Sequence, residues 1–544
     1  MKRRFLFLLA LGFIASHGGL SGVESAKATQ VSQAQGCTIR VSNVRELVEA
    51  FDIASKNGQD DVICIQSGTY TINDTLRYDL THRLSECGKS LTVRGEGNVI
   101  IQPARGSIVD ILHITTNSCK EKDKGDITIR GIIFQNGSRG VRVETEYANI
   151  RFINNTFRNN RYEGAKVWSM FGSIDFENNA FISNETGARV NHSYYGPINF
   201  RNNHFIGNVS ISGAVNVESA SGPITLVGNT FVNNKIMHGS ATFAGSPKAI
   251  ILANNVFYGN TYLGEGSRTS GSGVYISTAR AAPPKNPQIP RPPNPHTIGE
   301  GIINIVNNTF SMNRSSNVGG GIYIKSELYK INLYNNIFWN NISENDGHEI
   351  YVDNSPKDTV IIAHNLFTSS THPIAPIDFS RPQHPKIYVK SLDLYNKDIQ
   401  AGCSKSGSFG NIQADPMFVN PEKGNFRLRA GSPAIDKGCN SAPSIPKTDK
   451  DGNQRIWNGI VDMGAYEHGP WPEPKEPDIE IQPQAQPQSQ SEQQTQPRTR
   501  PQAQPQNTQQ SLPSIPDSSQ IKERAKEYIK EKSLELLKDK LFRR

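Results

Sequence analysis

The sequence lacks several features that would assign a chemistry directly. It has no Cys-x-x-Cys pair and no His-Glu-x-x-His, which argues against the common zinc sites. Gly88-Lys89-Ser90 is not preceded by the first glycine of a phosphate-binding loop. No later stretch reaches ~18 consecutive apolar residues, so we expect no transmembrane helix.

The chain also lacks a strong excess of positive charge once its two ends are set aside. The formal net charge is +8, of which residues 2–4 supply +3 and residues 521–544 supply +4. The remainder therefore carries only +1, and the basic balance does not indicate a nucleic-acid partner.

The N-terminus has the pattern of an export signal. Lys2-Arg3-Arg4 precedes an apolar run over 5–15 and then small residues, which predicts a signal peptide over 1–28. We therefore expect an exported protein, located in the periplasm, at the cell surface or outside the cell.

Cysteines are few, but they are even in number and cluster near the two ends of the central region. In an exported protein such a set indicates disulfides, with Cys403–Cys439 the clearest pair because no other cysteine is near them in sequence. The pairing among the remaining four stays open; these are Cys37, Cys64, Cys87 and Cys119.

One phrase of eleven residues recurs through the middle of the chain, reading aliphatic-x-apolar-x-Asn-Asn-x-Phe-x-x-Asn. Successive copies start 23, 24, 24, 26, 26, 53, 28 and 29 residues apart. A repeat of this length predicts a solenoid, because no single unit buries its apolar face alone. The starts are Ile127, Ile150, Ile174, Ile198, Ile224, Ile250, Ile303, Ile331 and Val360.

Within each repeat, apolar and polar residues alternate with a period of two. In the second copy Ile150, Phe152 and Phe157 point inward. The Asn pair marks a bend, because Asn tolerates left-handed backbone angles and its amide can bond to the next coil. A Gly and another short strand follow. The pattern predicts an all-β right-handed parallel β-helix over 127–395, without the periodic leucines of a leucine-rich repeat.

Residues 37–126 are expected to begin the solenoid. Apolar residues over 44–51 have helical spacing, and a helix there would cover the exposed edge of the first coil. The order of helix, strand and Gly68-Thr69-Tyr70 resembles the entry of pectate-lyase-like β-helix proteins. This resemblance implies the same fold.

The spacing of 53 residues between two of the repeats contains a Pro-rich stretch at 279–299. Because Pro cannot join a strand ladder, we expect a loop extruded from one coil and not a lost coil. This loop is either an inert insertion or a lid over a groove.

The most specific resemblance lies in residues 411–468, within a C-terminal module over 396–468. Its blocks read NIQADPMF, NFRL, GSPAIDKG, DKDGNQR and VDMGAYE in that order. They resemble the choice-of-anchor Q module that closes secreted bacterial β-helix proteins. This resemblance implies surface display and a pectate-lyase-like superfamily, and it does not indicate whether the protein has an activity. A shorter likeness, through Gly319-Gly320-Gly321-Ile322, is to polymorphic outer-membrane adhesins.

The composition changes twice after the module. Residues 469–516 are rich in Pro and Gln, which predicts a disordered linker. Residues 517–544 have Glu and Lys at helical spacing, which predicts a basic amphipathic helix. No sorting motif occupies the place of the family's anchor, so this helix is either a solvated tail or a contact to an anionic cell surface or a partner.

The repeats also align a row of basic residues on the strand after the Gly. Glycoside hydrolases of this fold need converging carboxylates, and the sequence offers no such set and no Gly-His-Gly. A lyase needs only a cation for the uronate carboxylate and a base for the adjacent proton. Arg142, Lys166 and Arg189 occupy one outward position in three successive coils. The residues that we assign to substrate binding are Arg142, Glu144, Trp168, Asn191, Tyr194 and Tyr195.

Candidate catalytic residues are Lys166, Arg189 and His192, the last because it titrates near neutral pH. Two functions stay open: a protein that binds an acidic glycan and cleaves it as a lyase, or a non-catalytic surface adhesin or coat protein in which the solenoid is a rigid spacer. Polysaccharide binding is common to both, and the basic row is either its site or a solvated face. We expect no cofactor and no metal. Residues 449–453 have Ca²⁺-like spacing but place the Gly too early, so a tight turn is expected.

Overall fold

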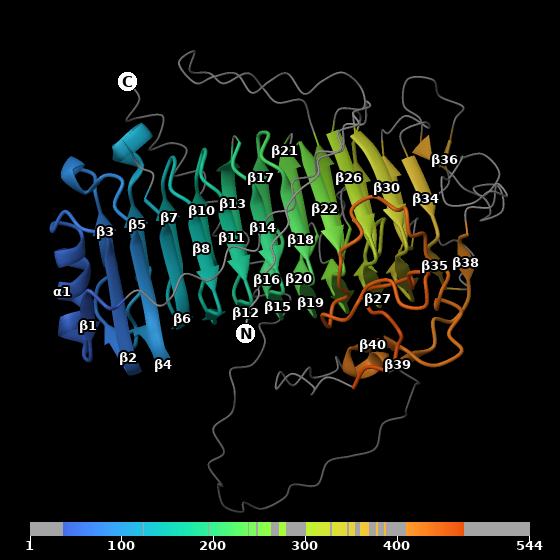
Figure 1. The fold of residues 1–544 in the computed structure, drawn as a ribbon, viewed down its shortest axis with the longest axis horizontal. Coiled ribbons are helices and arrows are strands. Elements are labelled where there is room, and N and C mark those ends of the chain that lie inside the picture. Colours follow the sequence, from blue (N-terminus) through green and yellow to red (C-terminus); the bar gives the residue numbers. More distant parts are fainter. Residues whose placement is uncertain are drawn as a thin grey trace, which may run out of the picture. The chain divides into compact units, whose positions relative to one another are not determined.

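The chain folds into a right-handed parallel β-helix, as the repeats predict (Figure 1). Within the described residues no helix is long and apolar enough to cross a membrane. The predicted signal, Pro-rich loop and C-terminal helix, and the linker after 472, lie outside them. The computed structural model describes residues 36–122, 125–193, 195–210, 212–237, 239–245, 248–262, 271–278, 301–326, 329–344, 348–353, 360–368, 377–378, 386–387 and 410–472.

Parallel strands from successive coils stack along the solenoid, and the largest sheet contains two such stacks, which we call stack I and stack II. The long strands β2, β4 and β6 extend across both. Stack I contains β1 (Ile39–Val41), β2 (Asp61–Ile72), β4 (Leu91–Pro103), β6 (Ile127–Gln135), β8 (Ile150–Ile153), β11 (Ile174–Glu177), β14 (Ile198–Arg201), β18 (Ile224–Val227), β22 (Ala249–Ala253), β26 (Gly301–Val306), β30 (Tyr329–Tyr334) and β34 (Val360–Ala363). Stack II adds β9 (Thr156–Arg158), β12 (Ala180–Ile182), β15 (His204–Ile206), β19 (Thr230–Val232), β23 (Val256–Tyr258), β27 (Thr309–Ser311), β31 (Ile337–Trp339), β35 (Leu366–Phe367) and β38 (Ile412–Gln413).

A separate sheet, which we call stack III, carries the predicted basic row. It contains β3 (Leu76–Asp79), β5 (Leu112–Thr115), β7 (Val141–Glu144), β10 (Glu163–Trp168), β13 (Thr186–Ser193), β17 (Val215–Ser219), β21 (Ala241–Gly245), β25 (Val274–Thr278), β29 (Ile322–Lys325) and β33 (Ile350–Asp353). Two-residue strands form a further short sheet: β16 (Val209–Ser210), β20 (Lys235–Ile236), β24 (Thr261–Tyr262), β28 (Arg314–Ser315) and β32 (Ile342–Ser343).

Equivalent residues of neighbouring repeats lie directly above one another. Phe181 pairs with Phe157 and Phe205, and its ring centroid lies 4.9 and 4.7 Å from theirs. This spacing equals the distance between hydrogen-bonded strands, so each fully buried ring stacks on the next without distorting the backbone. Phe257 pairs with Phe310 in the same way, so the stack continues in register across the 53-residue spacing.

The two asparagines of the repeated pair have different tasks. The first adopts the left-handed conformation that the bend needs, with φ of 55° at Asn154 and at Asn178. The second is buried, and its Oδ1 accepts bonds from the preceding coil; Asn179 accepts from the backbone N (2.9 Å) and Nδ2 (3.1 Å) of Asn155. This ladder satisfies polar groups that would otherwise be buried without partners. It contains Asn155, Asn179, Asn203, Asn229, Asn255, Asn308, Asn336, Asn365 and Asn411.

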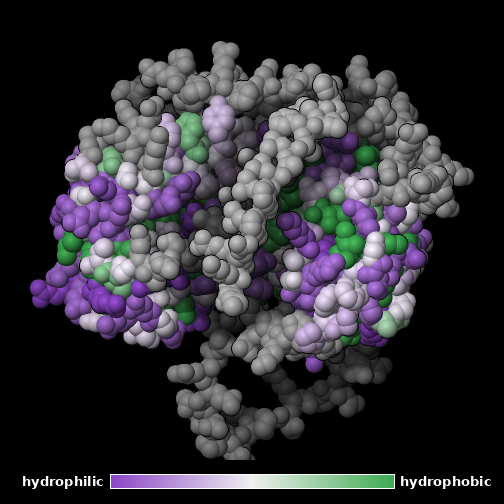
Figure 2. Space-filling view, viewed as in Figure 1, coloured by the Kyte–Doolittle hydropathy of each residue, from purple (hydrophilic) through white to green (hydrophobic). Residues whose placement is uncertain are grey.

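The N-terminal end of the core is covered by α1 (Val44–Ala54), which confirms the predicted cap (Figure 1). Asn43 caps this helix by accepting a 3.0 Å bond from the backbone N of Glu46. Leu47 and Phe51 are buried against the first coil. Hydrophilic side chains dominate the visible surface at this end (Figure 2). Short 3₁₀ segments occur at η1 (Leu84–Glu86), η2 (Asn117–Lys122) and η4 (Pro421–Lys423).

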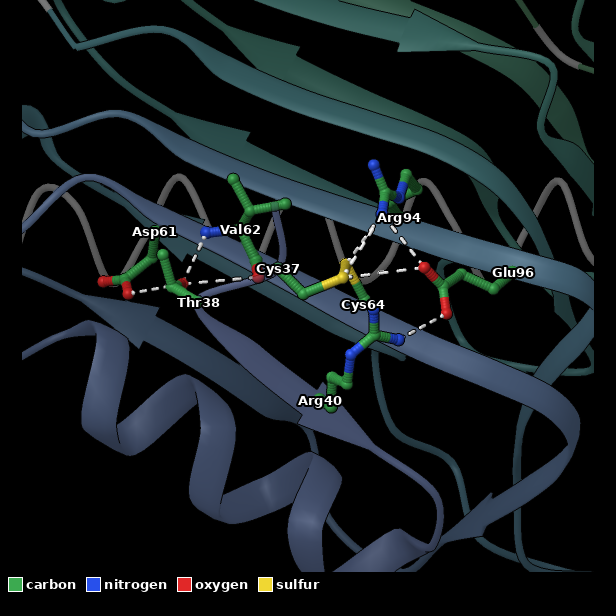
Figure 3. The surroundings of a disulfide bond; sticks show 8 residues. All are labelled: Cys37, Thr38, Arg40, Asp61, Val62, Cys64, Arg94 and Glu96. Atoms are coloured by element: carbon green, nitrogen blue, oxygen red, sulfur yellow. Dashed lines mark hydrogen bonds and ion pairs between the residues drawn. A yellow bond between two sulfur atoms is a disulfide. The ribbon is translucent and has the colours of Figure 1, made fainter. Parts of the chain in front are cut away.

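Two disulfides tie together the first coils, and they settle the pairing that the sequence left open. Cys37 is bonded to Cys64, and Cys87 to Cys119. Arg94 Nη2 lies 3.3 and 3.1 Å from the two sulfurs of the first bridge (Figure 3). Near the other end Cys439 is also disulfide-bonded, whereas its predicted partner Cys403 lies outside the described residues.

Residues 410–472 pack on one flank of the later coils. The left-handed asparagines of the repeats hold their backbone: Asn254 Nδ2 donates to Thr448 O (2.6 Å) and Asn307 Nδ2 to Asp462 O (2.8 Å). The apolar contact between the two parts includes Val232, Tyr258, Ile337, Phe418, Phe426 and Met463. Short antiparallel pairs are β36 (Ile377–Asp378) with β37 (Lys386–Ile387), and β39 (Phe418–Asn420) with β40 (Asn425–Leu428).

The predicted turn at 449–453 is built on one buried carboxylate. Asp449 accepts bonds from the backbone N of Asp451 (2.9 Å), Asn453 (2.8 Å) and Glu467 (3.0 Å). Both of its oxygens are therefore engaged in holding the chain.

Candidate functional site

The outward face of stack III aligns the predicted basic residues in one row. Lys166 of β10 pairs in register with Arg142 of β7 and with Arg189 of β13. Trp168 is aligned in the same way with Glu144 and Asn191 in the neighbouring row. Successive members of each row are therefore one strand spacing apart, about 4.8 Å.

Among the described residues, Lys166 is the member of the row without a hydrogen bond or ion pair. Its side chain is half-buried. Burial lowers the pKa of Lys166, Glu163 opposes this shift, and the nearby arginines, Arg139 among them, reinforce it. A partly desolvated cation of this kind favours an incoming anion.

Arg189 is held beneath the surface by a buried carboxylate that sequence reasoning missed. Arg189 is only 8% exposed; its Nη1 lies 3.4 Å from Glu163 Oε1, and its Nη2 donates to Ser212 Oγ (2.5 Å). Glu163 also accepts a 2.8 Å bond from Arg139 Nε, and Arg139 contacts Asp110. Burial raises the pKa of Glu163, but its arginine neighbours outweigh burial and the net shift is downward.

Arg142 belongs to a second network, which includes a histidine outside the predicted set. Arg142 Nε donates to Glu144 Oε1 (2.9 Å), and His113 Nε2 lies 3.4 Å from Glu144 Oε2. The hydrogen bond with His113, followed by those from Arg142, lowers the pKa of Glu144 to about 2 against the opposing effect of burial. His113 Nε2 also lies 3.0 Å from Thr115 Oγ1.

The other side of His113 faces Arg77 of β3. Arg77 Nη1 lies 3.1 Å from His113 Nδ1. Because a guanidinium can only donate, Nδ1 must accept, so the ring proton of neutral His113 is on Nε2 and faces Glu144. Leu112-His113-Ile114-Thr115 alternates as Val141-Arg142-Val143-Glu144 does, a signal that would have found His113 had the repeat been extended one coil earlier.

Aromatic side chains line the edge of this face. Trp168 is half-buried at the end of β10. Beyond it, Phe171 stacks between Tyr147 (ring centroids 4.6 Å apart) and Tyr195 (5.9 Å), and Tyr195 is 37% exposed. Tyr147 and Phe171 were not predicted, because they follow the strands at the turn and not within the aligned positions.

Two predicted residues cannot be placed as side chains. His192 lies in β13, but its side chain is outside the described part of the structure, as is all of Tyr194. The predicted row therefore places Arg142, Lys166, Arg189 and Trp168 together, whereas the position of the imidazole of His192 stays a prediction.

The described residues contain one cluster with potential metal ligands, and it lies far from this row in the sequence. Its members are Cys37, Cys64 and Glu96. The two sulfurs are bonded to each other, so they are not thiolate ligands, and Glu96 pairs with Arg40 (3.0 Å) and Arg94 (2.9 Å) (Figure 3). This cluster does not form a metal centre.

Comparison with known proteins supports the fold and does not assign a function. Residues 109–281 match the family described as "Right handed beta helix region". No curated protein matches the chain in sequence. Pectate lyase Pel9A is similar in structure, with a TM-score of 0.40 and 15% identity over 76% of this chain and 89% of that one. The PL6 family alginate lyase AlyGC has a TM-score of 0.29 and 13% identity over 68% and 58% of the two chains. At these values neither lyase's activity transfers to this protein.

Proposed function

We propose that the protein binds an acidic polysaccharide on the outward face of stack III. The observation that carries this proposal is Lys166, a half-buried ammonium without a partner among the described residues, placed in register between Arg142 and Arg189. The carboxylate of a uronate unit would supply the missing counter-charge. Trp168 lies two residues farther along the same strand and offers an apolar ring face to the adjacent sugar.

The two arginines have a different part in this proposal. Both are already paired with carboxylates, Arg142 with Glu144 and Arg189 with Glu163. Their carboxylate partners neutralise much of the arginine charge, which leaves Lys166 as the cation of the row without an ion pair among the described residues. Specificity for an anionic polymer over a neutral one follows from this arrangement.

The binding proposal is tested with a uronate polymer and a neutral polysaccharide. We expect the uronate polymer to bind and the neutral one not to. Lys166→Gln should weaken binding. The binding that remains should depend less on salt concentration, because salt screens the contact that the lysine charge makes. Trp168→Ala should weaken binding with little change in salt sensitivity. Lys330→Gln, an exposed lysine of β30, is the matched control. Unchanged affinity in Lys166→Gln would contradict the proposal.

A second candidate function is β-elimination at the same place, favoured by the downward pKa shift of Lys166. A neutral amine would remove the proton beside the uronate carboxylate. The released electron pair would form the new carbon–carbon double bond as the glycosidic oxygen departs and takes up a proton. Arg189 and His192 are the further catalytic candidates. A lyase would produce the absorbance of the unsaturated product, and His192→Ala should reduce this absorbance more than it reduces binding. Binding without this absorbance would favour the non-catalytic adhesin or coat protein.

Export and surface retention complete the proposal. Disulfides in the first coils suit an oxidising compartment. We assign retention to residues 517–544, in the place where the choice-of-anchor Q resemblance leads us to expect an anchor. Deleting this segment should release the protein from anionic vesicles without altering thermal unfolding. Equal vesicle binding by the deleted and full chains would show that the segment is not an anchor.

A further inference from the structure

A cavity of about 350 Å³ lies between α1 and β3, at the N-terminal end of stack III. Polar and apolar surface contribute about equally to its lining. The polar side chains include Asp52 and Ser55 from the end of α1, Arg77 and Asp79 from β3, and Arg83 after it. This volume is at the lower end of the range for small-molecule sites, so it suits a single ring-sized unit.

One residue of the cavity, Arg77, lies in register with the basic row. Arg77 pairs in register with His113, and His113 with Arg142, which is the neighbour of Lys166. Hydrogen bonds join the same residues, from Arg77 through His113 to Glu144. Lys166 and Arg77 are three strand spacings apart in this row, about 14 Å. A chain lying along the row would therefore cover several sugar units between them.

The cavity also lies at the end of the row, because β3 is the first strand of stack III. Helix α1 covers the first coil and supplies one wall of the cavity through Asp52 and Ser55. Arg83 fixes this wall, because its Nη1 donates to Ser55 O (3.1 Å). A polymer that follows the row toward the N-terminal coils thus meets the capping helix.

We infer that this cavity binds the terminal unit of the acidic polysaccharide, with Arg77 contacting the acidic group of that unit. The inference rests on the proposed function. Arg77 is exposed on β3, and its contact with His113 leaves other donors of the five-donor guanidinium for a carboxylate. The carboxylates of Asp52 and Asp79 supply acceptors for the ring hydroxyls. The protein would then recognise chain ends in addition to the repeating unit.

The test is the dependence of affinity on chain length. Binding of oligouronates of two to six or more units to the full chain is measured by calorimetry for the wild type, Arg77→Gln and Lys166→Gln. Wild-type affinity should rise with length until a ligand spans from Lys166 to the cavity. Arg77→Gln should lower the affinity of these longest ligands about tenfold, the effect of one lost charge-assisted contact. It should lower that of the shortest ligands less, because a ligand too short to reach both sites can still bind at Lys166 alone. Arg105→Gln, an exposed arginine outside the cavity, is the control.

The outcomes separate the two proposals. If no oligouronate binds the wild type, the proposed function fails and this inference fails with it. If Lys166→Gln weakens binding while Arg77→Gln binds as the wild type does at every length, binding of an acidic polysaccharide on stack III is supported and the proposed site for its terminal unit is wrong. An equal loss at all lengths in Arg77→Gln would show only a long-range charge effect, and would also overturn the terminal site. Thermal unfolding of each variant verifies that it is folded.

Discussion

Asn341 Nδ2 donates a 2.5 Å hydrogen bond to Oε2 of Glu349, and this carboxylate ends a ladder of asparagine amides. In that ladder Nδ2 of each asparagine donates to Oδ1 of the asparagine one coil on, and at Asn341 the carboxylate of Glu349 takes the place of that oxygen. The other oxygen of Glu349 accepts from Thr368 Oγ1 (2.7 Å). The ladder contains Asn160, Asn184, Asn208, Asn234, Asn260, Asn313 and Asn341.

This position predicts an unusual dependence of stability on pH. Burial raises the pKa of Glu349 to about 7, although its hydrogen bonds oppose the shift. The unfolded chain releases this proton near pH 4.5, whereas the folded chain keeps it until about 7, so the unfolded state binds fewer protons between these values. Glu349 therefore makes the fold less stable as the pH rises through this window, by roughly 2–3 kcal/mol at its end.

We expect Glu349→Gln to remove this loss. The amide preserves the shape and can still accept from Asn341, while Thr368 can accept from it. Chemical denaturation at pH 4.5 and pH 8 should show a gain for the variant over the wild type that is larger at pH 8. Glu344→Gln, at an exposed glutamate near the same coil, should show no such difference. A gain that is equal at both pH values would contradict a buried titrating carboxylate.

The sequence alone predicted the fold because the same physical demand recurs in every coil. Each bend needs one residue at positive φ and one buried amide, and Asn-Asn supplies both, as at Asn154 and Asn155. Each coil also needs one large apolar residue in register, and the Phe of the phrase supplies it. Register then placed Arg142, Lys166 and Arg189 in one row without any further information.

The parts that could not be predicted depend on side chains that meet across coils. Glu163 begins β10 and turns toward Arg189 of the next coil, and no local pattern announces that pairing. The same holds for His113 and Glu144, which are 31 residues apart. The pairing among the first four cysteines depends on which of them lie in adjacent coils. The irregular loops of these coils hide the repeat, so the sequence alone did not show which cysteines are neighbours.

The two asparagines of one pair should respond very differently to substitution. Asn203 Oδ1 accepts from two groups of Asn179, and its Nδ2 donates to Phe176 O and Asn229 Oδ1. Asn203→Ala removes these four buried hydrogen bonds and leaves the backbone N–H of Asn179 without its acceptor, so unfolding free energy should fall by about 3 kcal/mol or more. The neighbouring Asn202 is exposed at φ 55°, where Gly is tolerated, so Asn202→Gly should change stability by less than about 1 kcal/mol. If urea denaturation showed the same loss of unfolding free energy in both variants, the different roles of the two asparagines would be contradicted.

The C-terminal disulfide is tested by counting thiols. Cys439 is disulfide-bonded, and no free cysteine occurs among the described residues. We predict Cys403 as its partner, so the denatured, non-reduced wild type should show no titratable thiol and Cys403→Ser should show one. Peptide mapping should locate that thiol at Cys439, and loss of a loop of about 35 residues should cost roughly 2–4 kcal/mol. Six thiols in the wild type, or a thiol elsewhere in the variant, would contradict the pairing.

Glu163 should behave in the opposite sense to Glu349, although both are fully buried. Its folded pKa lies below its ordinary value, because Arg189, Arg139 and Lys166 outweigh the effect of burial. The stability it contributes is therefore present above the unfolded pKa, about 4.5, and is lost as the pH falls through the lower folded value.

Glu163→Gln should accordingly destabilise the protein by about 3–5 kcal/mol at pH 7, since two arginines lose a buried counter-ion. The difference from the wild type should shrink as the pH is lowered below about 4.5, because the unfolded chain then binds a proton at this carboxylate before the folded chain does. Glu177→Gln, at an exposed glutamate that ends β11, is the matched control and should leave the free energy of unfolding unchanged at pH 7 and below pH 4.5. If the loss in Glu163→Gln were constant from pH 7 to pH 3, the carboxylate would not be titrating against these arginines, and Arg189 would need another cause for its place beneath the surface.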